Sequence, residues 1–354
     1  MLDLYQEAKE SFGTSKQGEA VSVYLLQNKN GMKVRVTDYG ASLVSIIVPD
    51  KNGSMTDVLL GYDNVTGYET HTCYFGAVIG RNGNRIANAQ LTINGTVYSL
   101  DQNDNENNLH SGVKGMDAKV WAVKQATDTS ITLTCKSADR EQGFPGNMDA
   151  QVTYVLTDDN AVEHHSDAVS EPDSGANFTT PAYFNLSGHG SGDVLGQELM
   201  LRASHFTPVI DAKAIPTGEI APVAGTPMDF TTAKTIGRDI ASDDIQIGYG
   251  GGFDHNFVLD KAEKGAFELM AQAYAPDTGI EMKAYTDLPG VQFYSGNFVT
   301  EQEGKQGAVY GKRHGFCLES QYFPNSVNEP GFESPILKAG EVYRTKTSYQ
   351  FGVR

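Results

Sequence analysis

Cationic side chains and long apolar runs are both scarce in this 354-residue chain, and each shortage excludes a class of protein. Lysine and arginine number 27 against 44 aspartate and glutamate residues, which gives a formal net charge of −17. Such a charge repels phosphate backbones and anionic membrane surfaces, so we expect no nucleic-acid partner. No stretch approaches the ~20 apolar residues of a membrane helix, so we expect no membrane span. A neutral small molecule is the expected partner.

Cysteine is equally scarce. The chain contains three, Cys73, Cys135 and Cys317, and an odd, sparse set argues against a disulfide framework and favours a reducing compartment. Residues 1–10 contain acidic side chains and no apolar core run, so they do not have the pattern of a secretory signal. Both observations indicate a cytoplasmic protein.

Helical periodicity is the fourth shortage, since only short pieces near residues 64–69 and 234–241 show it. Strand-like alternation recurs instead, for example at residues 130–135 and 151–156, and Asn94-Gly95 predicts a hairpin turn. With 38 glycines, 13 prolines, no linker and no repeat of fixed period, the chain is predicted to be all-β. We expect one domain over residues 1–354, a large antiparallel β-sandwich rather than a propeller.

Glu319 is the most informative residue, because its apolar neighbours Phe316 and Leu318 predict that the carboxylate is buried. Burial disfavours the charged form and raises the pKa, which suits a carboxylate to act as a general base near neutral pH. The alternative is a structural carboxylate that pairs with an arginine or caps backbone amides.

Glycine-rich and histidine-containing segments give no sign of a cofactor. Residues 188–192 and 248–252 are rich in glycine, but neither lies between a strand and an evident helix, so we expect loops rather than nucleotide sites. The eight histidines lack metal-ligand spacing, and His164 and His165 would point to opposite faces of a strand. We therefore expect neither a metal nor another cofactor.

Three further polar residues stand in tight backbone contexts. Arg85 follows a turn that contains Asn84, His110 lies on a loop beside small residues, and Asp254 begins an apolar strand. Each alone is open to a structural or a functional interpretation. Together with Glu319 they indicate a site for a polyol, because arginine donates to hydroxyls, aspartate accepts from them, and a Glu–His couple can move protons.

Seven motifs, in order along the chain, give a specific resemblance. They are GRNGNRI (80–86), NLHSG (108–112), EQGFPG (141–146), YFNLSG (183–188), IPTGEI (215–220), FDH (253–255) and FCLESQ (316–321). Over nearly its whole length the chain resembles the galactose mutarotase, or aldose 1-epimerase, family.

The resemblance implies a large antiparallel β-sandwich with a sugar cleft. It also implies interconversion of the α and β anomers of a free aldose, without metal or redox cofactor, by a monomer or homodimer. Glu319 would take the proton from the anomeric hydroxyl. His110, Arg85, Asp254 and the neighbouring Asn84 would hold the hydroxyls and the ring oxygen.

The chain departs from the family pattern at three expected pocket positions. Thr180 and Pro181 stand where the family has Asn and the His that protonates the ring oxygen, and Leu288 stands where it has a Gln that touches the sugar. Proline has no titratable group and no N–H, so it cannot supply a proton and should lie at a sheet edge or bulge.

The missing acid leaves several interpretations open. His110, His164 or His165 could replace it, and His189 is a weaker candidate. Loss of a general acid costs about 10²–10⁴-fold in rate, so the first hypothesis is a slowed or altered aldose 1-epimerase. The alternatives are a catalytically silent carbohydrate-binding protein, and an enzyme that uses Glu319 as base on a less polar substrate.

Overall fold

A long antiparallel sheet of nine strands forms one layer of the computed structural model, which describes residues 5–354. Side chains along its strands point alternately into the core and toward solvent, as the alternation of apolar and polar residues at 130–135 and 151–156 predicts. In spatial order they are β10 (Ala122–Ala126), β11 (Ser130–Ser137), β12 (Asn147–Leu156), β13 (Ala161–Glu171), β28 (Val342–Val353), β22 (Ile280–Thr286), β21 (Glu268–Tyr274), β16 (Glu198–Leu201) and β19 (Lys234–Thr235).

Two smaller antiparallel sheets form the second layer. One contains β1 (Lys9–Thr14), β2 (Ala20–Gln27), β3 (Lys33–Thr37), β4 (Leu43–Pro49) and β5 (Met55–Asp57). The other, in spatial order, contains β15 (Tyr183–Phe184), β26 (Phe316–Gln321), β23 (Gly290–Tyr294), β20 (Asp254–Val258), β17 (His205–Thr207) and β18 (Ala221–Pro222).

Short elements complete the fold. Four two-stranded pairs are β6 (Arg85–Ile86) with β9 (Asn108–Leu109), β7 (Gln90–Ile93) with β8 (Thr96–Ser99), β14 (Ser174–Gly175) with β27 (Ile336–Leu337), and β24 (Gln302–Glu303) with β25 (Val309–Tyr310). The helices of residues 5–354 are α1 (Val65–Thr70), α2 (Ile245–Gly250) and five 3-10 turns at Ala87–Ala89, Met116–Ala118, Glu141–Gly143, Lys305–Gly307 and Ser326–Asn328. None of these helices has the length and hydrophobicity needed to cross a bilayer.

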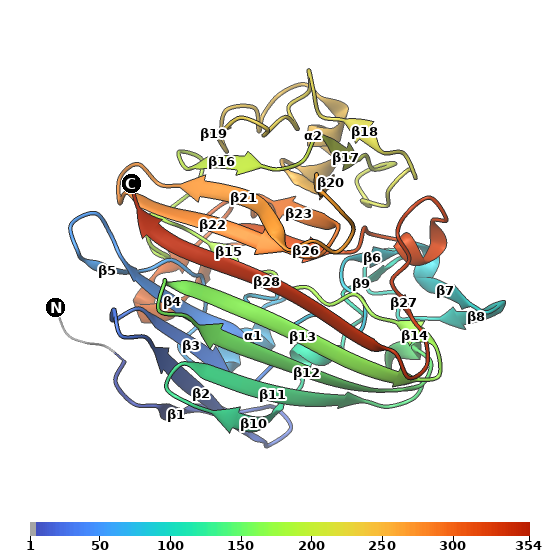
Figure 1. Ribbon diagram of the computed structural model, residues 1–354, viewed down its shortest axis with the longest axis horizontal. Helices are drawn as coiled ribbons and strands as arrows, with labels where there is room; N and C mark the ends of the chain where they lie inside the picture. Colours follow the sequence, from blue (N-terminus) through green and yellow to red (C-terminus); the bar gives the residue numbers. More distant parts are fainter. Residues whose placement is uncertain (1–4) are drawn as a thin grey trace.

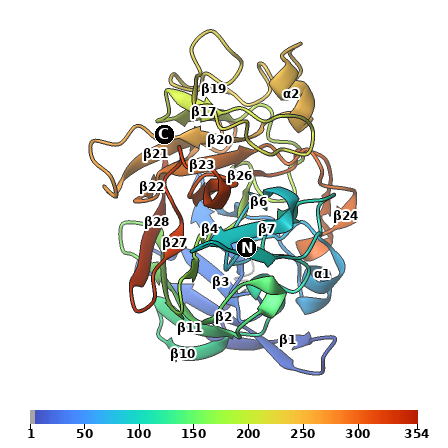
Figure 2. The same cartoon turned by 90° about the vertical axis from the view of Figure 1, so that its right-hand side faces the viewer.

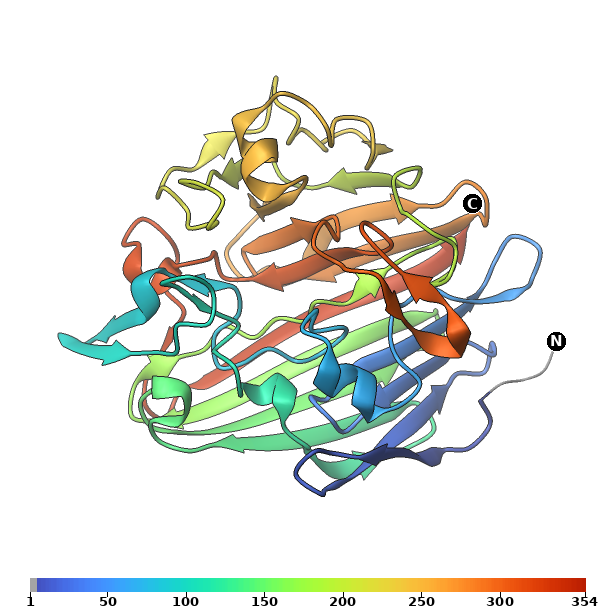
Figure 3. The ribbon, with the colours of Figure 1, turned by 180° about the vertical axis from the view of Figure 1, so that it is seen from behind.

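The main core lies between the layers. Figure 1 shows the long sheet across the front of the molecule, and Figure 2 shows it edge-on at the left, with the smaller sheets to its right. Residues from all three sheets, such as Val34, Val152 and Phe293, are fully or almost fully buried in one apolar cluster. On the outer side of the second layer, Figure 3 shows α1 and the segment that carries β6 to β9. The all-β sandwich prediction is confirmed.

Local predictions have mixed outcomes. The hairpin at Asn94-Gly95 is present between β7 and β8, and α1 overlaps the predicted 64–69. The predicted helix at 234–241 is wrong, because its start is β19. The second helix is α2, where the Asp244 side chain accepts from two backbone N–H groups and Gly251 ends the helix at φ 67°. Part of the glycine-rich 248–252 segment is therefore helical.

Arg81 anchors the chain just before the polar turn at 82–85. Its side chain is buried, with 2% of the residue exposed, and the guanidinium donates to the Ser137 hydroxyl. It also donates to four backbone carbonyls, those of Ser137, Ala138, Pro145 and Gly146. The five N–H donors of this rigid guanidinium thus join the segment around Arg81 to residues 137–138 and 145–146.

Candidate functional site

One face of the six-stranded sheet carries a row of polar side chains. Antiparallel partners point to the same face of a sheet, and residues two apart along a strand share a face. Glu319 on β26 pairs with Gln292 on β23, and Asp254 on β20 pairs with Tyr294, two residues after Gln292. All four therefore point to one face, whereas Leu318 points into the core.

A cavity of about 210 Å³ lies on this face. Its volume is below the range of about 300–1,000 Å³ typical for drug-sized ligands, so it suits a small molecule. The lining residues come from the sheet, from the β6–β9 pair and from the loop after α1. They are Thr72, Cys73, Tyr74, Asn84, Arg85, Leu109, His110, Pro181, Tyr183, Asp254, Gln292, Tyr294, Phe298 and Glu319.

Glu319 is buried, with 5% of the residue exposed. Within residues 5–354 its carboxylate has no hydrogen-bond donor and no ion-pair partner, so the structural interpretation of this residue lacks support. Burial and, to a smaller extent, the Asp254 charge raise its pKa, Arg85 lowers it, and the net result is a pKa of about 8. A carboxylate with this pKa and with free oxygen atoms can accept a proton from a ligand near neutral pH.

Asp254 is held by a chain of amide side chains. The Gln292 amide donates to its Oδ1 at 2.9 Å, and the Gln321 amide donates to the Gln292 oxygen at 3.2 Å. Asn84 in turn donates to Gln321 at 3.4 Å. Burial raises the pKa of Asp254, while Arg85 and the Gln292 hydrogen bond lower it. The network fixes Asp254 as an acceptor at the cavity wall.

His110 is held in one tautomer by the backbone. The Asn84 N–H donates to its Nδ1 at 3.0 Å, and the His110 N–H donates to the Asn84 carbonyl at 3.0 Å. Since Nδ1 accepts, the neutral ring carries its proton on Nε2. Burial, aided by the Arg85 charge, lowers the pKa of His110 to about 3, so the ring is neutral at physiological pH. His110 is therefore a fixed neutral donor.

Arg85 lies between the acidic groups of the site. Its Nε–H donates to Asp104 at 2.7 Å. Its two terminal amino groups have no hydrogen-bond partner within residues 5–354, and its charge acts on Glu319, Asp254 and His110. The Asp104 contact orients the guanidinium, which leaves these two amino groups able to donate to a ligand.

No group of three or more histidine, cysteine or acidic residues within residues 5–354 is arranged to hold a metal ion. The small polar cavity therefore combines four groups: a carboxylate that can act as a base, a neutral hydrogen-bond donor, a cation and a hydrogen-bond acceptor. They are Glu319, His110, Arg85 and Asp254.

Comparison with known proteins identifies the family. A family model described as aldose 1-epimerase matches residues 22–350. The chain belongs to the aldose 1-epimerase family. It is 37% identical to the galactose mutarotase of Sus scrofa over 343 residues, which are 97% of each chain. It is 36% identical to the aldose 1-epimerase of Escherichia coli over 344 residues, 97% of this chain and 98% of that protein. The family relationship makes this chain an isomerase.

Solved structures of the aldose 1-epimerase family share the fold. An aldose epimerase homologue from C. elegans has a TM-score of 0.86 at 27% identity, with 94% of this chain and 98% of that chain covered. The galactose 1-epimerase from Lactobacillus acidophilus has a TM-score of 0.84 at 25% identity, with 98% of both chains covered.

Pro181 lines the cavity of this aldose 1-epimerase family member. It lies before β15, which is the end strand of its sheet, and its carbonyl accepts from the Gly76 N–H at 3.0 Å. Neither a free sheet edge nor a bulge describes this position, because isolated bridges join Phe184 to Leu59 and Thr179 to Ile79 on the open side of β15. Because Pro181 is outside the strand ladder, its missing N–H removes no hydrogen bond between strands.

Two of the three predicted pocket substitutions do not line the cavity. Thr180 points away from it, with its hydroxyl 3.3 Å from His164 Nδ1. Leu288 is buried in the turn before β23, four residues before Gln292. Leu288 is not among the residues that line the cavity. The prediction that these two positions change the pocket is corrected.

The histidines considered as replacement acids lie elsewhere, apart from His110. His164 is buried beneath Thr180, and its Nε2 contacts the Ser166 hydroxyl at 3.2 Å. His165 contacts Glu163, and His189 contacts the Tyr310 hydroxyl at 2.8 Å. Within residues 5–354, His110 is the only imidazole that lines the cavity.

Several lining residues were not predicted from the sequence. Gln292 lies in the apolar run Val291 to Tyr294, so the signal that identified Glu319, a polar residue in an apolar strand, would also have identified it. Tyr74 and Phe298 lie on loops whose positions depend on tertiary packing. Their sequence context gives no sign of their location.

Proposed function

We propose that this protein is an aldose 1-epimerase that interconverts the α and β anomers of a free aldose in the cytoplasm. The observation that carries the proposal is an unpaired, buried Glu319 in the same small cavity as the fixed Nε2–H donor of His110. The names of the relatives, galactose mutarotase and aldose 1-epimerase, support it.

Glu319 is the proposed base. In its ionised form it takes the proton from the anomeric hydroxyl, while the bond between C1 and the ring oxygen breaks and C1 becomes an aldehyde carbon. The low polarity that raises its pKa also favours transfer of the proton to it. Rotation about the C1–C2 bond presents the other face of the aldehyde, and reclosure reverses the proton movements.

His110 takes the place opposite the base that Pro181 cannot fill. Its Nε2–H donates a hydrogen bond to the ring oxygen and stabilises the negative charge that develops there, and Nε2 keeps its proton until this oxygen attacks C1 again on reclosure. A neutral imidazole whose pKa is lowered by its surroundings can act as such an electrophile. The terminal amino groups of Arg85 stabilise the same charge.

Asp254 and Asn84 complete the proposed sugar site. Asp254 accepts from sugar hydroxyls, and its amide network keeps it in place before the substrate arrives. No cofactor enters this mechanism, because every step is a proton movement or a change of hydrogen bonding.

The test is polarimetry on freshly dissolved α-glucose and α-galactose. The unchanged protein should accelerate the rotation change over buffer, and Glu319→Gln should lose at least ~10²-fold in kcat. The exposed Glu341 offers a matched control, since Glu341→Gln should keep full activity. No acceleration by the unchanged protein, with none gained on Pro181→His, would refute the proposal.

The second candidate is a carbohydrate-binding protein without catalysis, and the specific observation in its favour is Pro181 at the cavity wall. It predicts saturable sugar binding that Glu319→Gln leaves unchanged. A less polar substrate has weaker support, because Arg85, Asp254 and Gln292 keep the cavity polar.

A further inference from the structure

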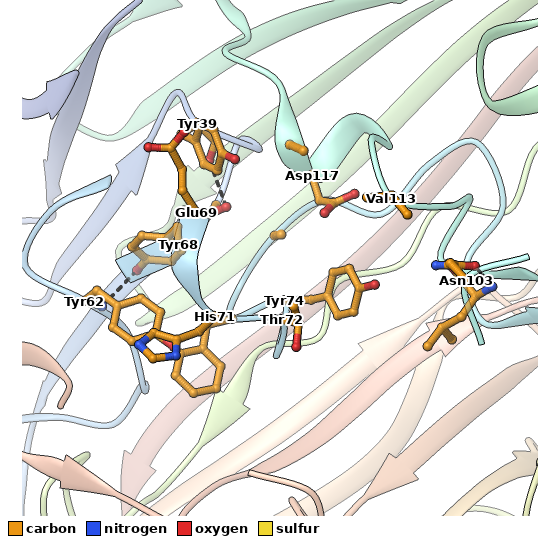
Figure 4. Close-up of a pocket in the computed structure, with 15 residues that line it drawn as sticks. Tyr39, Tyr62, Tyr68, Glu69, His71, Thr72, Tyr74, Asn103, Val113 and Asp117 are labelled. Atoms are coloured by element: carbon orange, nitrogen blue, oxygen red, sulfur yellow. Dashed lines mark hydrogen bonds between the residues drawn. The ribbon is translucent and has the colours of Figure 1, made fainter. Parts of the chain in front are cut away.

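Gln321 is fully buried on the same face of the six-stranded sheet as Glu319, two residues further along β26. It lines neither the Glu319 cavity nor the neighbouring cavity of about 470 Å³, which Figure 4 shows. The Gln321 side chain therefore does not meet a ligand in either space, and its influence on the site acts through the residues around it.

A missing side chain on β23 gives Gln321 its reach. Its partner across the strand pair is Gly290, and Asn256 lies on β20, on the other side of β23. The Gln321 Nε2 donates to the Asn256 Oδ1 at 3.0 Å across this gap. A Cβ atom at position 290 would lie 2.6 Å from that oxygen, which is closer than non-bonded atoms approach. The glycine therefore opens the space in which the two amides meet.

The Gln321 amide joins two separate parts of the site. Its Nε2 also donates to the Gln292 Oε1 at 3.2 Å, and the Gln292 Nε2 donates to the Asp254 Oδ1 at 2.9 Å. Its own Oε1 accepts from the Asn84 Nδ2 at 3.4 Å. The backbone N–H of Asn84 in turn donates to His110. One buried side chain thus links the acceptor of the sugar site with the turn that fixes the neutral donor.

The direction of each amide in this network follows from Asp254. An ionised carboxylate only accepts hydrogen bonds, so the Gln292 amide must turn its N–H toward Asp254 and its oxygen toward Gln321. Gln321 must then present an N–H to Gln292, which leaves its oxygen for Asn84. The two ends of an amide have nearly the same shape, so an amide without such constraints can rotate and exchange donor for acceptor. Gln321 is the link that prevents this exchange at Gln292 and Asn84.

We propose that Gln321 is a positioning residue, which holds the amides of Gln292 and Asn84 in one orientation and so fixes the pattern of donors and acceptors that the cavity presents to a sugar. The inference rests on the proposed function for the identity of the ligand. Its own support is the complete burial of Gln321, its hydrogen bonds to three amide side chains and the gap at Gly290.

The test compares Gln321→Met with the unchanged protein, because methionine has a similar length and no amide. Polarimetry gives kcat and KM for galactose, and titration calorimetry gives Kd. Gln197→Met is the matched control, because Gln197 is 3% exposed, donates to Asn185 at 2.8 Å and lines neither cavity. Circular dichroism and Tm check that both variants fold.

Gln321→Met should raise both KM and Kd for galactose at least about tenfold, the effect of one lost hydrogen bond to a charged group. Because Gln321 donates to neither Glu319 nor His110, kcat should change less than about threefold. Gln197→Met should lower Tm and leave KM unchanged. A KM in Gln321→Met equal to that of the unchanged protein overturns the inference, as does a fall in kcat without a rise in KM.

A double-mutant cycle separates positioning from a general loss of packing. In Asp254→Asn the group that faces Gln292 can donate as well as accept, so the direction of the amides is no longer fixed. In that background Gln321→Met should raise KM at most about twofold, whereas fully additive effects would overturn the inference. If Gln321→Met does not fold, Asn256→Ala replaces it, since this change removes one acceptor of Gln321. It should raise KM at least about threefold, and an unchanged KM would count against the proposal.

Failure of the proposed function has a different signature. An unchanged protein that binds galactose without accelerating anomer interconversion refutes the proposed reaction, and the Kd comparison then decides the role of Gln321. An active enzyme whose KM is insensitive to Gln321→Met overturns the positioning role alone. A protein that binds no sugar refutes both.

Discussion

The pH dependence of catalysis gives the most direct test of Glu319 as the base. Burial and the Asp254 charge raise its pKa from an ordinary 4.5 to about 8. The base must be ionised to accept a proton, and at pH 7 roughly one tenth of it is ionised, against roughly nine tenths at pH 9. Since kcat/KM reports the ionisation state of the free enzyme, it should rise about tenfold per pH unit below pH 7 and about tenfold in total from pH 7 to 9.

The assay is polarimetry on α-glucose between pH 5.5 and 9.5, with the buffer rate subtracted at each pH. Asp254→Asn removes the like charge that raises the pKa, so the midpoint should move to lower pH while burial keeps it above 4.5. The exposed Asp243 supplies the matched control, because Asp243→Asn should leave the midpoint in place.

Two results would contradict this role of Glu319. One is a kcat/KM that is independent of pH from 6 to 9 in an active enzyme, and the other is the same midpoint in Asp254→Asn and in the unchanged protein. Either result would mean that Glu319 does not titrate as a buried carboxyl group beside Asp254.

Three further predictions concern stability and the acid. Because the pKa of Glu319 is raised in the folded state, its contribution to stability is present below about pH 4.5 and is lost as pH rises through about 8. Glu319→Gln should therefore raise the free energy of unfolding by a few kcal/mol at pH 9, with a higher Tm, and should raise it by less at pH 6. A variant with a lower Tm than the unchanged protein at pH 9 would contradict this. Arg81→Met leaves four buried carbonyls without their donor, at about 1–3 kcal/mol each, so its Tm should fall sharply compared with that of Arg202→Met at the surface. Pro181→His should raise kcat by up to ~10²–10⁴-fold in the polarimetric assay, and no gain in a folded variant would show that His110 already supplies the full effect.

The sequence predicted site residues both on the six-stranded sheet and outside it, and it missed residues of both kinds, such as Gln292 and Tyr74. Glu319 and Asp254 lie on strands, where the period of two determines which side chains share a face. Leu288 was misplaced because a motif match gives position along the chain but not distance from the cavity. Thr180 was misplaced for a similar reason, since its strand-like neighbours do not reveal which way a segment outside the ladder points.

Loop-borne groups depend on contacts between distant segments, which a single sequence does not reveal. A cavity of about 470 Å³ beside the Glu319 cavity, for example, is lined by residues of α1, of the loop after it and of the turn at Met116–Ala118. The helix α2 was not predicted because its glycines disfavour a helix, although Asp244 is a residue type that commonly caps a helix N-terminus.

The tautomer of His110 depends on a main-chain group rather than on a side chain. The donor is the N–H of Asn84, and every amino acid except proline supplies that group. Asn84 has a φ of 57°, a conformation that aspartate and glycine also adopt readily, so either could replace its side-chain amide and keep this N–H. The position of the proton on His110 is thus set by the backbone at residue 84, independently of the side chain there.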